Sequence, residues 1–259
     1  MTSSPTFALT YDYRCPYGRI VHDHVATALK AGAPWTVKFT PFCLGQAHVE
    51  DGQTDIWDRP QDDTGILALQ ASIAVRDTQA DKFLNMHHAL YEYRHTQNGN
   101  LRERAPLSEV IAEHGADVDA MWAEVDSGRP LATIKEEHTA YGRTHSVWGV
   151  PTFIVGSKAV FVRLLDRPMG DAKLATSTID RILDNIGWDN LNEFKHTSYG
   201  RSHAVWGVPT FIVGSKAVFV RLLDRPMGDA KLATSTIDRI LDNIGWDNLN
   251  EFKHTSVPR

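Results

Sequence analysis

Between a predicted strand and a predicted helix, the chain reads Asp12-Tyr13-Arg14-Cys15-Pro16-Tyr17-Gly18-Arg19. Residues 7–11 alternate large apolar side chains with small or polar ones, as a half-buried strand does. After Pro16, apolar residues recur at helical spacing as far as Leu29. Because proline is favoured in the first turn of a helix, this pattern predicts that Cys15 lies at or near the helix N-cap.

The remaining elements follow in an order that indicates the fold. They are a strand over residues 35–40, a polar loop over 46–63, helices through 65–142, a hairpin of strands 152–155 and 159–164, and a helix over 171–185. A parallel strand-helix-strand start followed by a hairpin and a packing helix is the plan of a thioredoxin fold. The sequence therefore predicts an α/β thioredoxin fold with a helical domain inserted between its two halves.

The C-terminal part of the chain is duplicated. Residues 141–198 recur as residues 199–256, and the copies differ only where Thr144 becomes Ser202 and Ser146 becomes Ala204. Solenoid repeats need three or more copies, so we interpret the pair as a recent tandem duplication or an assembly artefact. The predicted divisions are an N-terminal half of the fold (1–45), a helical insertion (46–142), a C-terminal half (143–198) and its second near-identical copy (199–256).

Only one copy can complete the sheet beside the first two strands. We expect the first copy to do so, because the helix before it delivers it directly and looping it out would cost entropy. The second copy must then pack on the body or pair with another molecule, and domain swapping would give a homodimer. Deleting residues 199–256 is expected to leave a folded, more soluble protein.

The composition excludes several partners. The formal net charge is -5 and no cluster of Lys and Arg stands out, so we expect no nucleic-acid partner. No apolar run approaches the roughly 18 to 20 residues of a membrane-spanning helix, so we expect no membrane partner. The first six residues contain no basic side chain and do not resemble a signal peptide, which favours a cytoplasmic location.

The chain has two cysteines, Cys15 and Cys43, which cannot form a disulfide framework. No Cys/His grouping has zinc-ligand spacing, so we expect no metal site. The 12 histidines are scattered, and we expect them to be solvated or to cap helices.

At this point a resemblance to a known family is visible. Residues 12–19 resemble the active-site segment of DsbA-like thioredoxin-fold proteins, and Gly149-Val150-Pro151-Thr152-Phe153 resembles their cis-proline loop. The resemblance covers about residues 7–185 and the duplicated tail. The superfamily includes thiol-disulfide oxidoreductases, kappa-class glutathione transferases and 2-hydroxychromene-2-carboxylate isomerases.

This chain departs from the redox members of the family at one position. It has Cys-Pro-Tyr-Gly in place of Cys-x-x-Cys, so Gly18 stands where the second cysteine would be. A monothiol variant cannot store an oxidised state as a local disulfide, and we do not expect a strong dithiol oxidase. Cys43 is expected to be buried filling rather than a distant resolving thiol.

The resemblance implies that Cys15 is the catalytic residue, supported by Pro16, Tyr17, Gly18 and Arg19. A helix N-terminus stabilises a thiolate. Arg14 and Arg19 are expected to lower the thiol pKa further. Tyr17 is expected to cover the sulfur, and Gly18 to leave room beside it.

The resemblance also implies a substrate-binding segment made of Val150, Pro151 and Thr152. A cis bond before Pro151 would turn the Val150 backbone toward Cys15. An extended peptide or a thiol tripeptide could then pair with it like an added strand.

Three functions remain open. The first is a thiol oxidoreductase or transferase that acts through the Cys15 thiolate, by mixed disulfides or with a thiol cofactor. The second is an inactive protein that binds a peptide or partner in the same groove. The third is a thiol-dependent isomerase or kappa-class-like glutathione transferase. We expect no tightly bound cofactor; the partner would be a small thiol (glutathione or mycothiol) or a protein thiol. A lowered thiol pKa would distinguish an enzyme from a binder.

Overall fold

The computed structural model describes residues 4–197 and 207–256. The strands are β1 (Thr6–Tyr11), β2 (Thr36–Pro41), β3 (Thr152–Val155), β4 (Lys158–Leu164), β5 (Leu191–His196), β6 (Thr210–Val213), β7 (Lys216–Leu222) and β8 (Leu249–His254). The α-helices are α1 (Pro16–Lys30), α2 (Leu44–Ala47), α3 (Ile66–Thr78), α4 (Ala80–Thr96), α5 (Arg104–Glu113), α6 (Val118–Asp126), α7 (Arg129–His145), α8 (Ala172–Gly187) and α9 (Ala230–Gly245). Two 3-10 turns, η1 (Ile56–Asp58) and η2 (Pro60–Asp62), lie in the predicted polar loop.

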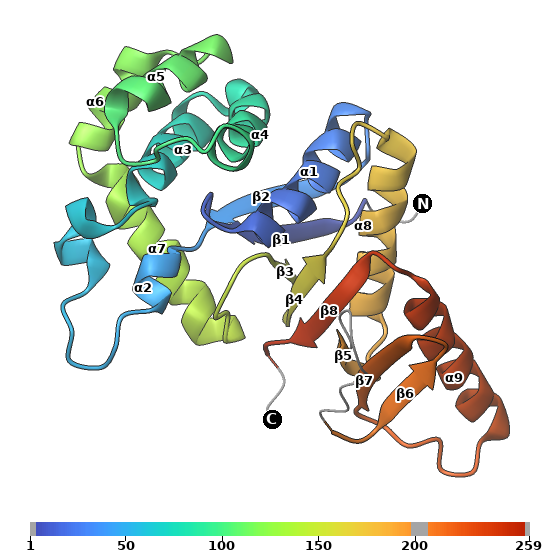
Figure 1. Ribbon diagram of the computed structural model, residues 1–259. Coiled ribbons are helices and arrows are strands. Elements are labelled where there is room, and N and C mark those ends of the chain that lie inside the picture. The colour runs from blue at the N-terminus through green and yellow to red at the C-terminus, as the bar shows by residue number, and fades with distance from the viewer. Residues whose placement is uncertain (1–3, 198–206, 257–259) are drawn as a thin grey trace.

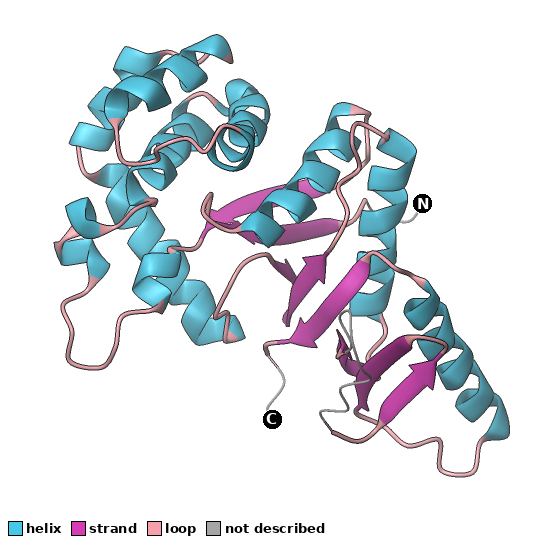
Figure 2. Cartoon of the chain, in the orientation of Figure 1, coloured by secondary structure: helices cyan, strands magenta, loops and turns pink. Residues whose placement is uncertain are grey.

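The strands form one sheet in the order β2-β1-β3-β4-β8-β5-β7-β6 (Figure 1). β1 and β2 are parallel and joined through α1, whereas β3 pairs antiparallel with β1 and with β4. α1 and α8 lie side by side against the sheet (Figure 2). The first copy therefore completes the sheet beside β1, as predicted, and the order of elements is that of the expected thioredoxin fold.

The helical insertion lies between β2 and β3 and contains α3 to α7. Its last helix continues past the predicted end at residue 142 to His145, where Ser146 adopts a positive φ of 52° and ends it. No helix of the described ranges 4–197 and 207–256 combines the length and the apolar character needed to cross a bilayer.

The two copies exchange their last strands. β8 of the second copy pairs with β4 of the first, and β5 of the first copy pairs with β7 of the second. β5 and β8 also pair with each other, with Phe194 opposite Phe252. Neither strand was expected from the sequence. Residues 198–206, where the predicted boundary between the copies falls, lie outside the described residues.

The contacts between α8 and α9 are reciprocal, so that each contact made by a residue of one helix is also made by its counterpart on the other. The Asn185 side-chain amide donates to Asn243 at 3.0 Å, and the Asn243 amide donates back at 3.1 Å. Arg181 pairs with Asp242, and Arg239 pairs with Asp184 in the same way. The two copies are thus related by an approximate two-fold axis that passes between β5 and β8.

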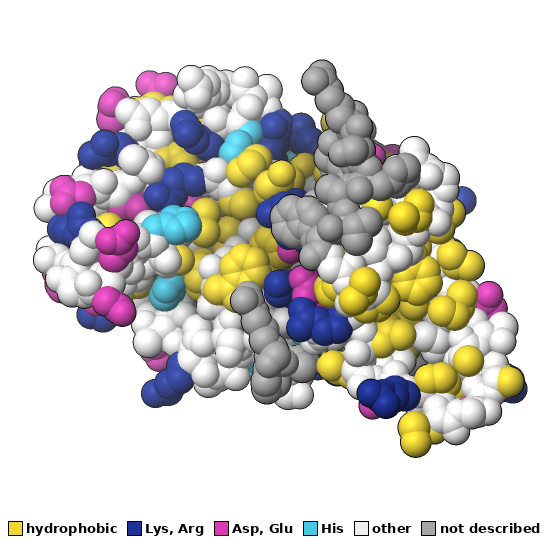
Figure 3. Space-filling model, turned by 60° about the horizontal axis from the view of Figure 1, so that its bottom comes forward, with side chains coloured by type: hydrophobic (Ala, Val, Ile, Leu, Met, Phe, Trp, Pro, Cys, Tyr) yellow, Lys and Arg dark blue, Asp and Glu magenta, His cyan; other side chains and the backbone are white. Residues whose placement is uncertain are grey.

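The surface of the second copy is unusually apolar. Among the described residues, eight of the eleven exposed large hydrophobic side chains belong to it: Val208, Ile212, Val213, Leu223, Met227, Leu232, Ile237 and Leu241. Figure 3 shows hydrophobic side chains over the right-hand part of the molecule, where this copy lies. An exposed apolar surface of this kind marks a site where another protein surface binds.

Candidate active site

Cys15 is the N-cap residue of α1, at the position predicted for it. Its sulfur accepts a hydrogen bond from the Gly18 backbone N–H at 3.3 Å. The thiol also donates to the Val150 carbonyl oxygen at 3.3 Å. The Val150–Pro151 peptide bond is cis. The start of α1 and the loop before β3 therefore bring together two residues that are 135 positions apart.

The surroundings of the thiol favour its protonated form. Burial raises the pKa of Cys15, and the backbone N–H groups of Gly18 and Tyr17 act in the opposite direction. Only 9% of the residue surface is exposed. The expected help from the helix N-terminus is present, but burial outweighs it. The prediction of a lowered pKa is therefore wrong.

The two arginines that flank Cys15 in the sequence do not supply positive charge to its thiol. Arg14 pairs with Asp12 at 2.7 Å and with Asp63 at 2.9 Å. Arg19 pairs with Glu92 at 2.9 Å. Both side chains are bound to carboxylates, and neither is among the main groups that shift the pKa of Cys15, so the prediction that they lower it is wrong.

A more distant arginine takes this role. The Arg163 guanidinium carbon, on β4, lies 4.3 Å from the centre of the Tyr17 ring, and the charge of Arg163 lowers the pKa of Cys15. The Tyr17 ring packs against the same apolar cluster as Cys15. Nothing in the local sequence pattern links residues 17 and 163, so Arg163 could not be predicted from the sequence.

The space beside Gly18 is filled rather than open. A Cβ atom added to Gly18 would lie 2.9 Å from the Tyr91 hydroxyl oxygen and 3.3 Å from the Cys15 Cβ. Tyr91 comes from α4, is buried, and donates its hydroxyl to the Asp12 carbonyl at 3.4 Å. The expectation of room at this position is wrong, because Tyr91 occupies the place where a second cysteine would begin.

Thr152 is used within the fold. Its backbone N–H donates to the Thr10 hydroxyl at 2.8 Å, and its own hydroxyl donates to the Gly149 carbonyl at 2.8 Å. Both bonds are buried; the first ties the start of β3 to β1, and the second closes the loop that precedes β3. Of the predicted segment, Val150 contacts the sulfur directly, whereas Thr152 holds the loop in place.

The second cysteine is remote from this chemistry. Cys43 is fully buried at the N-cap of α2, and burial raises its pKa to about 12. Both cysteines are free thiols. These surroundings suit a cysteine that packs in the core and do not suit a resolving thiol.

Several histidines are buried, contrary to expectation. The Tyr13 hydroxyl bonds His87 Nδ1 at 2.8 Å, and His87 Nε2 bonds His22 Nδ1 at 2.9 Å. His22 Nε2 then bonds the Thr10 carbonyl at 3.1 Å. With Tyr13 as the first donor, every atom of this chain is satisfied when both imidazoles are neutral. Burial lowers the pKa of His22 to about 4 and that of His87 also falls.

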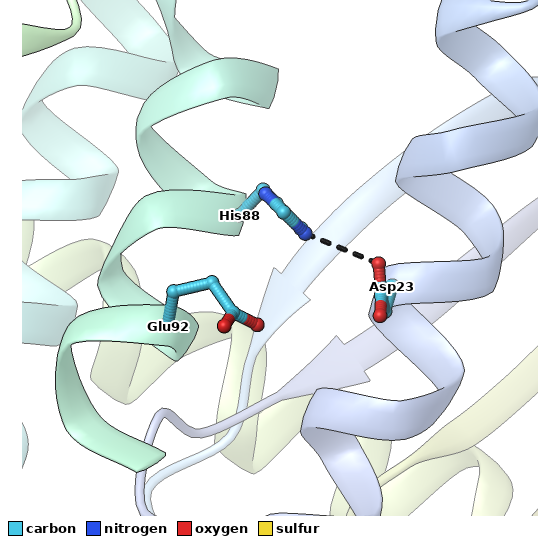
Figure 4. A group of neighbouring side chains, drawn as sticks. All are labelled: Asp23, His88 and Glu92. Carbon is cyan, nitrogen blue, oxygen red and sulfur yellow. Dashed lines mark hydrogen bonds and ion pairs between the residues drawn. The ribbon is translucent and has the colours of Figure 1, made fainter. Parts of the chain in front are cut away.

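One group of side chains has the composition of a metal site. Asp23, His88 and Glu92 place a ligand atom each within 4.8 Å of one another (Figure 4). Arg167 pairs with Asp23 at 2.6 Å and also pairs with Glu92. A cation would have to displace this arginine. We therefore interpret the group as an ion-pair network that joins α1, α4 and the segment after β4.

One family model and several solved structures match this chain. The family model of DSBA-like thioredoxin domains matches residues 8–167. No curated protein matches the chain. The cytosolic disulfide reductase DsbM from Pseudomonas aeruginosa with GSH is similar, with 19% identity, a TM-score of 0.47, and coverage of 69% of this chain and 99% of that one. A thioredoxin-like oxidoreductase from Silicibacter pomeroyi DSS-3 has 20% identity, a TM-score of 0.45, and coverage of 69% and 86%. DsbA of Pseudomonas aeruginosa has 16% identity, a TM-score of 0.44, and coverage of 71% and 88%.

Proposed function

Because the chain belongs to the family of DSBA-like thioredoxin domains, we propose that it is a thiol-disulfide oxidoreductase acting through the single thiol of Cys15. The supporting observation is the position of that thiol, at a helix N-cap and 3.3 Å from the Val150 carbonyl. A helix N-terminus favours an anionic sulfur. The main-chain groups of residue 150 can pair with an extended substrate.

The absence of a cysteine at position 18 defines the reaction. The Cys15 thiolate attacks one sulfur of a substrate disulfide, a new S–S bond forms, and the other substrate sulfur leaves as a thiolate. A second thiol then attacks this mixed disulfide and releases the Cys15 thiolate. The second thiol is a small one, glutathione or mycothiol, or a protein thiol. These two steps release one substrate sulfur as a thiol and leave the other in a disulfide with the second thiol. Another equivalent of the second thiol completes the reduction by attacking that disulfide, so that in total one disulfide is reduced and two thiols are oxidised.

Substrate binding itself can activate the thiol. In the free protein the thiol proton is donated to the Val150 oxygen. A substrate N–H that pairs with this oxygen removes the acceptor of that proton. The sulfur then keeps the Gly18 N–H and the charge of Arg163 as its stabilising partners. A cytoplasmic location suits this chemistry, because small thiols there keep cysteines reduced.

The test is to incubate the protein with oxidised glutathione and determine its intact mass. We expect one glutathionyl group, on Cys15, which reduced glutathione removes. Cys43→Ala should behave like the wild type, and Cys15→Ser should remain unmodified. If Cys15 stays unmodified in the native protein but is modified in the unfolded chain, the proposal is wrong.

One observation favours a second candidate, a binding protein without thiol chemistry. Burial raises the pKa of Cys15 and leaves little of it exposed. The pH dependence of Cys15 alkylation in a Cys43→Ala background separates the two candidates, because an unperturbed cysteine thiol has a pKa of about 8.5. A midpoint far above that value, together with no glutathionyl adduct, would support the binder. No residue-level observation favours the isomerase or the glutathione transferase.

A further inference from the structure

The second copy exposes a face that the first copy buries. Ile179 on α8 is 0% exposed, whereas its counterpart Ile237 on α9 is 42% exposed. On the hairpin, Ile154 is 5% exposed and its counterpart Ile212 is 57% exposed. These residues have the same sequence surroundings, so the difference comes from what packs on them.

In the first copy, the N-terminal half of the fold provides the covering. β1 pairs with β3 through Leu9 and Phe153, and α1 packs against α8. In the second copy, β6 is the last strand of the sheet, and its outer edge has no neighbouring strand among the described residues. The second copy is thus a C-terminal half of a thioredoxin fold without an N-terminal half.

Polar groups on this face also match those of the first copy. Trp35 donates to Asp180 at 3.2 Å, and Arg167 pairs with Asp23. Asp238 and Arg225 are the counterparts in the second copy, and both are exposed. Within residues 4–197 and 207–256, neither has an equivalent partner.

We propose that the second copy is a docking site for a β1–α1–β2 segment, residues 6–41, supplied by another molecule. The chain itself identifies this occupant, because the same surface sequence already holds such a segment in the first copy. The incoming β1 would pair with β6, and the incoming α1 would cover α9. Its Cys15 would then face Val208, the counterpart of Val150, and a second thiol site would form.

The occupant must lack a C-terminal half of its own. Each full chain has one N-terminal half and two C-terminal halves. Exchange between full chains would only move the empty face from one copy to another and would bury no additional surface. An N-terminal half in trans adds a new contact instead, and its docking does not depend on the chemistry of Cys15.

The test uses the full chain and a tagged fragment of residues 1–145, co-expressed or diluted from denaturant together. We expect a one-to-one complex by size-exclusion chromatography with light scattering. Ile237→Asp in the full chain should weaken it at least about tenfold, because a charge would be buried. Leu232→Asp is the matched control on the same helix. Leu232 is 46% exposed and its counterpart Leu174 is still 43% exposed in the covered copy, so this variant should bind normally.

Two outcomes would overturn the proposal. The first is a fragment that aggregates equally with and without the full chain. The second is equally tight binding of the fragment by the Ile237→Asp variant and by the wild-type chain. That result would show that the fragment had displaced the N-terminal half of the full chain from the first copy. Protection of the β6 backbone amides from hydrogen exchange in the complex provides a second readout of the docked strand.

Discussion

The charge environment of Cys15 is assembled from residues that are far apart in the sequence. The sulfur contacts Val150 and Gly18, and the positive charge that lowers its pKa comes from Arg163. Arg163 is itself held 3.5 Å from Glu251, a residue of the second copy. The duplicated segment therefore contacts the candidate site through an arginine and is not confined to the far end of the molecule.

Arg163→Gln should make Cys15 less acidic. Loss of this positive charge is expected to raise the midpoint of Cys15 alkylation, because the charge of Arg163 lowers the pKa of the thiol. Arg221→Gln is the matched control, because Arg221 has the equivalent position on β7 and pairs there with Glu193. The measurement is the alkylation rate against pH in a Cys43→Ala background. Equal midpoints for Arg163→Gln and the control would contradict the role of Arg163.

At the scale of elements, the contact between α1 and α4 explains why the position after Tyr17 is glycine. Tyr91 on α4 reaches the place where a side chain at position 18 would start. A second cysteine there would need the tyrosine to move. The monothiol pattern and the buried tyrosine are thus two parts of one packing arrangement.

Gly18→Ala should destabilise the protein by about 1 to 3 kcal/mol, because the new methyl group would be forced against the Tyr91 hydroxyl. In a Tyr91→Phe background the same change should cost less, since the hydroxyl is gone. Urea unfolding of the four proteins in this double-mutant cycle measures the coupling. Additive free energies of unfolding would show that Tyr91 does not exclude a side chain from position 18.

The buried histidine chain links β1, α1 and α4 and predicts a loss of stability in mild acid. Folded His22 has a pKa of about 4, below its unfolded value of about 6.5. As the pH falls below 6.5, the unfolded chain binds a proton that the folded protein does not, so stability decreases until about pH 4. Between pH 7 and pH 5, His22 alone should account for about 2 kcal/mol.

Urea unfolding at the two pH values tests this. The loss between pH 7 and pH 5 should be smaller by that amount in His22→Gln than in the wild type. A variant that loses as much stability as the wild type would show that His22 is not the group responsible.

The sequence predicted the elements around the candidate site well and missed the exchanged strands. Alternation identified β1 and β2, and turn residues identified the β3–β4 hairpin. β5 and β8 have the mixed sequence Leu-Asn-Glu-Phe-Lys-His and are buried only because strands of the other copy flank them. For the same reason Arg163 and Tyr91 were missed, since their roles depend on tertiary contacts that no local pattern encodes.

At the scale of the whole molecule, the two copies reproduce within one chain the contacts that two chains could make. Deleting residues 199–256 would remove the second copy. It would also take β8 away from β4 and β7 away from β5, so the edges of β4 and β5 would be exposed. The two-fold contacts of Asn185, Arg181 and Asp184 are all present in the first copy and can form between two shortened chains.

We therefore expect the shortened chain, residues 1–198, to be a strand-exchanged homodimer. Sedimentation equilibrium should give about twice the mass of one chain, and Arg181→Glu should weaken the dimer by placing two acidic groups together. Leu174→Glu, on the exposed side of the same helix, serves as the control. A shortened chain that stays monomeric at high concentration would show that β5 closes on its own β4.

The exchange of strands also places the last described strand in the interior of the sheet. β8 is the last strand in the sequence, yet it lies between β4 and β5. A ribosome therefore releases the neighbours of this strand before the strand itself is available. Until β8 is available, β4 and β5 of the nascent chain have unpaired edges, which can pair with each other or with a second nascent chain. Correct assembly of the sheet thus waits until β8 has been synthesised, and chaperones that bind exposed strand edges should influence the yield of this protein.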